Sequence, residues 1–232
     1  MSDRLDIEVG GIRLACQISG AVDGQPMVLL HALGERGADW DRVRAEFDPF
    51  YRVLTIDFRG HGDSDWPGHY TYELMRDDVL GILDQLAMDD VMLVGHSLGG
   101  VVAYLIAEDH PSRVERLIVE DATPPYPTDR AVPERPDGPL PFDWPVVPAI
   151  RGQLNDASAV CWDRLSEITA PTLLIGGGPS SHIAPAKLEE VARRVPQCTL
   201  VTIPTGHYVH AAAPAEFAAT VLEFLRERQA PS

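Results

Sequence analysis

The stretch Val91-Met-Leu-Val-Gly-His-Ser-Leu-Gly-Gly100 carries the pattern that decides the fold. It opens with apolar residues rich in valine, which predict a short buried strand. A helical pattern of apolar residues follows directly, at Val101, Val102, Leu105 and Ile106. The sequence therefore predicts a strand, a tight turn at Ser97 and a helix in direct succession.

The turn between this strand and helix predicts what Ser97 can do. A serine on a strained turn of this kind presents its hydroxyl above the edge of a sheet. Side chains at Gly95 and Gly99 would collide with the neighbouring strand and helix, so both positions require glycine. The amide of Leu98, in the first turn of the helix, can point at an oxyanion that develops near Ser97. The alternative interpretation is a glycine-rich turn with an incidental serine.

Further motifs extend this pattern along the chain. Asp57-Phe-Arg-Gly-His-Gly-Asp-Ser64 fits Asp-x-Arg-Gly-x-Gly-x-Ser, and residues 206–214 fit Gly-His-x-x-His-x-x-x-Pro. Together with Gly-x-Ser-x-Gly at 95–99, they make the chain resemble the α/β-hydrolase superfamily over nearly its whole length, in its serine esterase and cofactor-free haloperoxidase-like branch. The resemblance implies structural roles for Asp57, Arg59 and His61. These motifs are specific to the superfamily and not to a substrate.

The order of elements predicts the fold class. Short apolar strands alternate with helical patterns, which favours an α/β fold with a mostly parallel central sheet flanked by helices. Leu5–Val9 and Ile12–Ile18, on either side of Gly10-Gly11, predict an N-terminal hairpin. A chain of 232 residues most simply forms one domain, so we predict a single domain over residues 1–232.

Composition excludes some partners. The net charge of -16 argues against nucleic acid, which needs a basic face, and against an anionic membrane surface. The N-terminus predicts no signal peptide, and no apolar run approaches transmembrane length. The 3 cysteines are widely spaced and form no metal-binding pattern, so we predict a reduced, cytoplasmic protein. The oligomeric state is not indicated.

Residues 124–164 differ from the rest of the chain because they are crowded with proline. The resemblance implies that an insertion at this point forms a lid over the active site. We expect a short, extended and mostly non-helical flap, with a mobile loop as the alternative. The pocket beneath it is predicted to be lined by Leu33, Phe142 and Trp144.

A serine nucleophile needs a base within hydrogen-bonding distance. The resemblance assigns this role to His207, which follows the last predicted strand. The chain has 8 histidines; the family uses the positions of His31, His96 and His210 structurally, whereas His61, His69 and His110 fall in loops or at helix ends. His182 is predicted to be a loop or lid contact. The resemblance also implies a second oxyanion amide at Leu33, although Ala32 replaces the usual glycine of that loop.

A serine hydrolase of this family also uses an acid that orients the catalytic histidine, and in this sequence that acid is not at its usual position. Most of the family carries it in the loop that corresponds to residues 176–187, which contains no Asp or Glu here and has Ser180 or Ser181 at the usual site. A minority carries it after the preceding strand, where this chain has Asp121. We therefore predict Ser97, Asp121 and His207 as the triad, in the expected chain order. The alternatives are Glu120, which strand alternation points to the other face, and a dyad without an acid.

These residues predict a serine hydrolase that cleaves an ester or related acyl bond of a small molecule through an acyl-enzyme on Ser97. No metal or organic cofactor is implied. Perhydrolase and C–C hydrolase activities are the enzymatic alternatives, since the same fold supports them. A non-catalytic ligand-binding protein is the alternative of another class, favoured by Ala32 and by the missing acid after Gly176.

Overall fold

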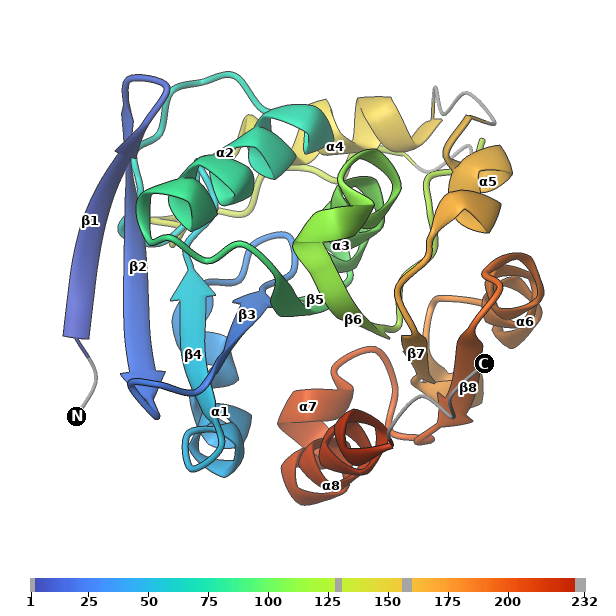
Figure 1. Cartoon of the computed structure of the whole chain (residues 1–232). Helices are drawn as coiled ribbons and strands as arrows, with labels where there is room; N and C mark the ends of the chain where they lie inside the picture. Colours follow the sequence, from blue (N-terminus) through green and yellow to red (C-terminus); the bar gives the residue numbers. More distant parts are fainter. Residues whose placement is uncertain (1–2, 128–130, 156–159, 228–232) are drawn as a thin grey trace.

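The computed structural model describes residues 3–127, 131–155 and 160–227 (Figure 1). Its N-terminal elements are the strands β1 (Asp3–Val9) and β2 (Ile12–Gly20), which pair antiparallel. Gly10 and Gly11 both have positive φ angles, 58° and 82°, which glycine adopts without strain. The predicted hairpin is confirmed.

The remaining strands complete a single sheet. They are β3 (Gln25–Leu30), β4 (Tyr51–Ile56), β5 (Val91–His96), β6 (Val114–Glu120), β7 (Thr172–Gly176) and β8 (Cys198–Thr202). The 8-stranded sheet has the order β1-β2-β4-β3-β5-β6-β7-β8. The pairs β1·β2 and β2·β4 are antiparallel and all the others are parallel. The predicted mostly parallel sheet is confirmed.

Helices cover both faces of this sheet (Figure 1). One face packs against α2 (Tyr72–Gln85), α3 (Leu98–Asp109) and α6 (Pro185–Arg194). The other packs against α1 (Asp41–Phe47) and α8 (Pro214–Arg226). Short helical turns lie at Gly37–Trp40, Pro111–Arg113, Leu165–Glu167, Gly178–Ser180 and α7 (Val209–Ala212). No helix among the residues described is both long and apolar enough to cross a membrane.

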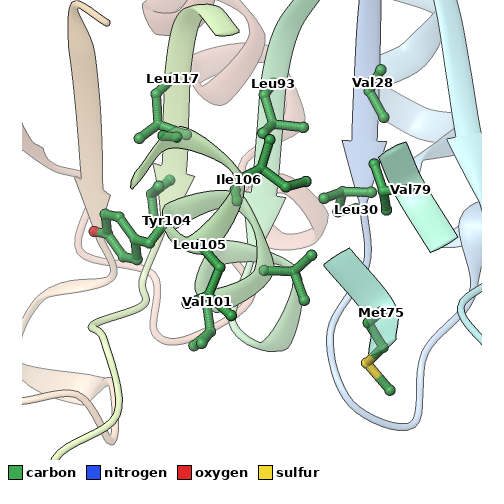
Figure 2. Close-up of a cluster of buried hydrophobic side chains, with 14 of the residues drawn as sticks. Val28, Leu30, Met75, Val79, Leu93, Val101, Tyr104, Leu105, Ile106 and Leu117 are labelled. Atoms are coloured by element: carbon green, nitrogen blue, oxygen red, sulfur yellow. The ribbon is translucent and has the colours of Figure 1, made fainter. Parts of the chain in front are cut away.

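The helix that follows Ser97 is the centre of the larger core cluster. Figure 2 shows Val101, Leu105 and Ile106 of α3 among side chains of β3, β5, β6 and α2. Almost every residue of α3 is buried, on all sides of the helix. A helix that is apolar all round is held by packing on every face, so the turn at its N-terminus is firmly placed.

Residues 124–164 connect β6 to β7 and are partly helical, which differs from the expected flap. The described residues up to Pro145 are irregular apart from an isolated β-bridge at Phe142, and α4 (Val146–Asn155) and α5 (Val160–Arg164) follow. Pro148 does not prevent α4, because the amides of the first helical turn have no partner within the helix. Residues 128–130 and 156–159 lie outside the described residues. A lid function for this segment stays a prediction.

Candidate active site

Ser97 lies at the sharp turn between β5 and α3. Its backbone has φ 52° and ψ -110°, in a region that non-glycine residues rarely occupy. A Cβ on Gly95 would lie 2.3 Å from the Gly99 carbonyl oxygen, and one on Gly99 would lie 2.3 Å from the Leu30 carbonyl oxygen. Both predicted collisions are therefore present, one with the helix and one with the neighbouring strand.

The loop after β3 lies against this turn. Gly99 donates its amide to the carbonyl of His31 at 3.1 Å, which ties the loop to the start of α3. The amides of Leu33 and Leu98 donate no hydrogen bond within the described part of the chain, and both residues line one cavity with Ser97. The Ala32 methyl group is accommodated, since that residue is buried and keeps an ordinary backbone φ. An oxyanion hole made by these two amides stays a prediction.

Buried histidines support the loop. His31 Nε2 accepts from the Phe58 amide at 3.0 Å, and His61 Nε2 accepts from the Gly34 amide at 3.1 Å. Burial lowers the pKa of His31 to about 4 and that of His61 to about 3. Both rings are therefore neutral at physiological pH, as acceptors must be. This arrangement agrees with a structural role for His61.

The motif at 57–64 also has structural contacts. Asp57 accepts the Gly37 amide at 2.7 Å and the Asp63 amide at 2.9 Å, which holds the loop in place. Arg59 makes two hydrogen bonds of 2.6 Å to the buried carboxylate of Asp78 on α2. Asp57 and Arg59 are absent from the lining of the cavity at Ser97. The structural interpretation of this motif agrees with these contacts.

Asp121 and His207 meet at the end of β6. The Asp121 Oδ2 atom lies 2.7 Å from His207 Nδ1 and also accepts the hydroxyl of Ser181, while Oδ1 accepts the Gly177 amide at 2.8 Å. Burial alone would raise the pKa of Asp121. The hydrogen bonds from His207, Ser181 and Gly177 outweigh it and hold that pKa below its ordinary value. Asp121 is therefore a carboxylate that fixes His207 Nδ1 as a donor.

The neighbouring carboxylate belongs to a different network. Glu120 accepts the amide of His210 at 2.9 Å and lies 2.8 Å from its Nδ1 atom. His96 donates Nε2–H to the carbonyl of His207 at 2.8 Å. Glu120 therefore binds His210 instead of His207, as strand alternation predicted.

His96, Glu120 and His210 are also the residues described here whose ligand atoms could hold a metal, within 4.8 Å of one another. All are buried, and the hydrogen bonds just described already engage these same atoms. The set is explained as a hydrogen-bonded support beneath the loop that carries His207.

The cavity at Ser97 has a volume of about 200 Å³. Ser97, Asp121 and His207 line it, as does Leu33. The prediction that Phe142 and Trp144 line this cavity is corrected, because neither belongs to its lining. The ring of Phe142 stacks on that of His61, with 5.8 Å between the ring centres, and the two residues also form an isolated β-bridge. These contacts hold Phe142 beside the glycine-rich turn. The segment reaches the cavity instead through Tyr126 and α4.

Several lining residues were not anticipated from the sequence. They are Tyr72, Val101, Ala122, Thr123, Tyr126, Ile150, Arg151, Leu154, Ile183 and Tyr208. His182 also lines the cavity, and its ring centre lies 4.0 Å from that of His207. A signal for α4 was present, since Val146, Val147, Ile150 and Leu154 have helical spacing. Proline density obscured it.

The sheet topology and the turn at Ser97 define the class of protein. The family model described as "alpha/beta hydrolase fold" matches residues 25–145, and the chain belongs to this family.

Individual relatives agree with this assignment. The chain is 31% identical over 219 residues to the sn-1-specific diacylglycerol lipase ABHD11 of Mus musculus, an alignment covering 75% of this chain and 71% of that protein. The enol-lactonase of Burkholderia xenovorans superposes with a TM-score of 0.88 at 25% identity, covering 96% of this chain and 100% of that one. A hydrolase of Pseudomonas aeruginosa superposes with a TM-score of 0.85 at 25% identity, covering 97% and 99%.

Proposed function

We propose that this protein is a serine hydrolase that cleaves an ester or related acyl bond of a small molecule through an acyl-enzyme on Ser97. The observation that carries the proposal is the shared cavity: Ser97 lines it on its strained turn, and so does His207, which is bonded to Asp121 at 2.7 Å. A nucleophile, a base and an orienting acid at one cavity are what acyl transfer requires.

The first half of the reaction forms the acyl-enzyme. The Ser97 hydroxyl attacks the acyl carbon while its proton passes to His207 Nε2. The carbonyl oxygen becomes an oxyanion, which the amides of Leu33 and Leu98 stabilise. The tetrahedral intermediate collapses, the bond to the leaving oxygen breaks, and His207 returns the proton to that oxygen.

The second half hydrolyses this intermediate. Water attacks the acyl carbon as His207 removes its proton, and a second oxyanion forms at the same amides. Collapse breaks the bond to Ser97 Oγ, which recovers its proton from His207, and the carboxylic acid leaves. Asp121 keeps His207 Nδ1 protonated and stabilises the imidazolium in both halves.

The relatives support hydrolysis as the reaction type. They include a diacylglycerol lipase and an enol-lactonase, whose names indicate action on acyl–oxygen bonds. The non-catalytic alternative relied partly on a missing acid. The 2.7 Å contact of Asp121 with His207 weakens that argument, because it supplies a carboxylate at the ring nitrogen that needs one.

The test is intact mass after treatment with a fluorophosphonate. Wild type should gain a single adduct, Ser97→Ala should gain none, and Asp121→Asn should react slowly. Hydrolysis of short 4-nitrophenyl esters should follow the same order. Folded wild type that forms no adduct and cleaves no ester would overturn the proposal in favour of a binding protein. Peroxide-dependent halogenation in the same preparations separates perhydrolase activity.

A further inference from the structure

Arg151 on α4 brings a positive charge to the cavity that the proposed mechanism does not use. Its side chain lines the cavity together with Ser97 and His207. The Nε atom is shielded from solvent and has no hydrogen-bond partner in the described part of the chain. A buried guanidinium N–H without an acceptor is costly, so its position needs an explanation.

The surroundings of Arg151 make this charge exceptional within the chain. Among the described residues it is the only lysine or arginine that lines the cavity. The described carboxylates make no salt bridge with it, although Asp and Glu together number 35 against 19 Lys and Arg. Asp121 also lines the cavity, but its oxygen atoms are engaged by His207, Ser181 and Gly177.

The helix that carries Arg151 is fixed above the site. Gln153 accepts the Tyr72 amide through Oε1 at 2.9 Å and donates through Nε2 to Glu73 at 2.9 Å, which fastens α4 to the first turn of α2. Val146, Val147 and Ile150 are buried beneath the same helix. The backbone at Arg151 is thus held in place, which limits the part of the chain that must become ordered when its side chain binds a ligand.

We infer that Arg151 binds a carboxylate of the substrate, so the hydrolase acts on esters or lactones that carry a free carboxylate away from the scissile bond. A guanidinium binds planar carboxylates through paired hydrogen bonds. A single cation matches a monoanionic carboxylate better than a phosphate monoester, whose charge approaches -2 at neutral pH. The inference rests on the proposed function and specifies its substrate class.

The experiment compares matched substrates that differ only in this charge. On the acyl side, 4-nitrophenyl hydrogen adipate is compared with the 4-nitrophenyl ester of adipic acid monoamide. On the alcohol side, 4-acetoxybutanoate is compared with 4-acetoxybutanamide. The variants are Arg151→Met and Arg151→Lys, and the control is Arg193→Gln, because Arg193 is exposed on α6 and does not line the cavity.

Wild type should prefer the carboxylated member of at least one pair. Arg151→Met should lower kcat/KM for that member by about 10- to 100-fold and change the neutral member by less than about 3-fold, since one charge-assisted contact is lost. Arg151→Lys should recover part of the preference, because it keeps the charge without the planar fork. Arg193→Gln should behave as wild type.

Equilibrium binding separates failure of this inference from failure of the proposed function. Calorimetry measures the carboxylated substrate with Ser97→Ala and with Ser97→Ala/Arg151→Met. If binding requires Arg151 but wild type shows neither hydrolysis nor a fluorophosphonate adduct, the carboxylate site is supported and the proposed hydrolase function is contradicted. If wild type hydrolyses esters and Arg151→Met changes kcat/KM by the same factor for both members of each pair, the carboxylate site is contradicted and the proposed hydrolase function stands.

Discussion

Glu120 and Asp121 are adjacent in the sequence, and both are buried carboxylates bonded to a histidine, yet they lie in different regions. Asp121 and His207 line the cavity together with Ser97, and the Asp121 Oδ2 atom lies 2.7 Å from His207 Nδ1. The Glu120–His210 pair, at 2.8 Å, lies outside the cavity lining and stacks through His210 on the buried Trp40. The same chemical pair thus lies at the cavity in one case and away from it in the other, because the two neighbouring residues at the end of β6 point to different sides.

A third buried carboxylate shows what partners contribute. Glu108 on α3 is 4% exposed, and its side-chain oxygen atoms have no hydrogen-bond partner among the described residues. Burial raises its pKa to about 8. Burial acts in the same direction on Glu120 and Asp121, but the electrostatic effect of His96 and His210 together with hydrogen bonds from His210 lowers the pKa of Glu120, and hydrogen bonds from His207, Ser181 and Gly177 lower that of Asp121. Among these buried acids, neighbouring histidines and hydrogen-bond donors therefore determine which form of the acid is stable.

The largest expected effect comes from breaking the pair that lines the cavity. Asp121→Asn should lower kcat for a cleaved ester by about 10³- to 10⁴-fold, because His207 loses the group that orients its ring and stabilises its positive charge. Steady-state kinetics and the melting temperature measure activity and folding separately. Turnover like that of wild type in the folded variant would exclude Asp121 as the acid.

Breaking the supporting pair should affect stability instead. Glu120→Gln should lower the free energy of unfolding by about 3 kcal/mol, because a buried charge–histidine contact is lost. Activity per folded molecule should stay within about 10-fold of wild type, since Glu120 does not line the cavity. Urea denaturation and active-site titration provide the values. A large loss of turnover at unchanged stability would reverse the roles of the two carboxylates.

Glu108 should determine part of the pH dependence of stability. Its folded pKa of about 8 exceeds the ordinary 4.5, so between these values the folded protein binds more protons than the unfolded chain. Stability from this group therefore falls as the pH rises through that window. Arg164 partly offsets the raised pKa, whereas Asp109 and Glu167 add to it.

Glu108→Gln removes this ionisation and tests whether the buried Glu108, unlike Glu120 and Asp121, has a raised pKa. We expect the variant to gain about 3 kcal/mol over wild type at pH 8 relative to pH 5, because glutamine does not ionise, whereas the buried Glu108 of wild type becomes costly as the pH rises. Chemical denaturation of both proteins at each pH measures the difference. A difference independent of pH would mean that Glu108 keeps its ordinary pKa in the fold.

The smallest effect should come from Ser181, which lies in the loop after β7 and contacts Asp121. Ser181 donates to Asp121 Oδ2 and accepts the Ile183 amide at 3.0 Å. Ser181→Ala should lower kcat by about 3- to 10-fold, because the Asp121 carboxylate loses one hydrogen bond but keeps those from Gly177 and His207. Ser181→Thr, which keeps the hydroxyl, is the matched control, and a loss equal to that of Asp121→Asn would contradict this minor role.

The turn at Ser97 shows which features can be predicted from the sequence. Gly95, Ser97 and Gly99 lie within a few residues of one another, so their steric requirements are local and the motif states them directly. The prediction of Asp121 needed the family resemblance, which implies an acid after either of two strands, together with the absence of Asp and Glu from the loop after β7. Phe142 and Trp144 were misplaced, because the path of an irregular proline-rich segment depends on distant partners such as His61.

By itself, the sequence determined the parallel sheet, the turn at Ser97 and the chain order of the candidate catalytic residues. Hydrophobic periodicity and glycine sterics are properties of neighbouring residues, so they can be recognised without coordinates. Only the tertiary structure decided that Asp121 contacts His207 across 86 positions, and that α4 brings Arg151 to the cavity. Such contacts depend on how separate elements pack, which a local pattern does not encode.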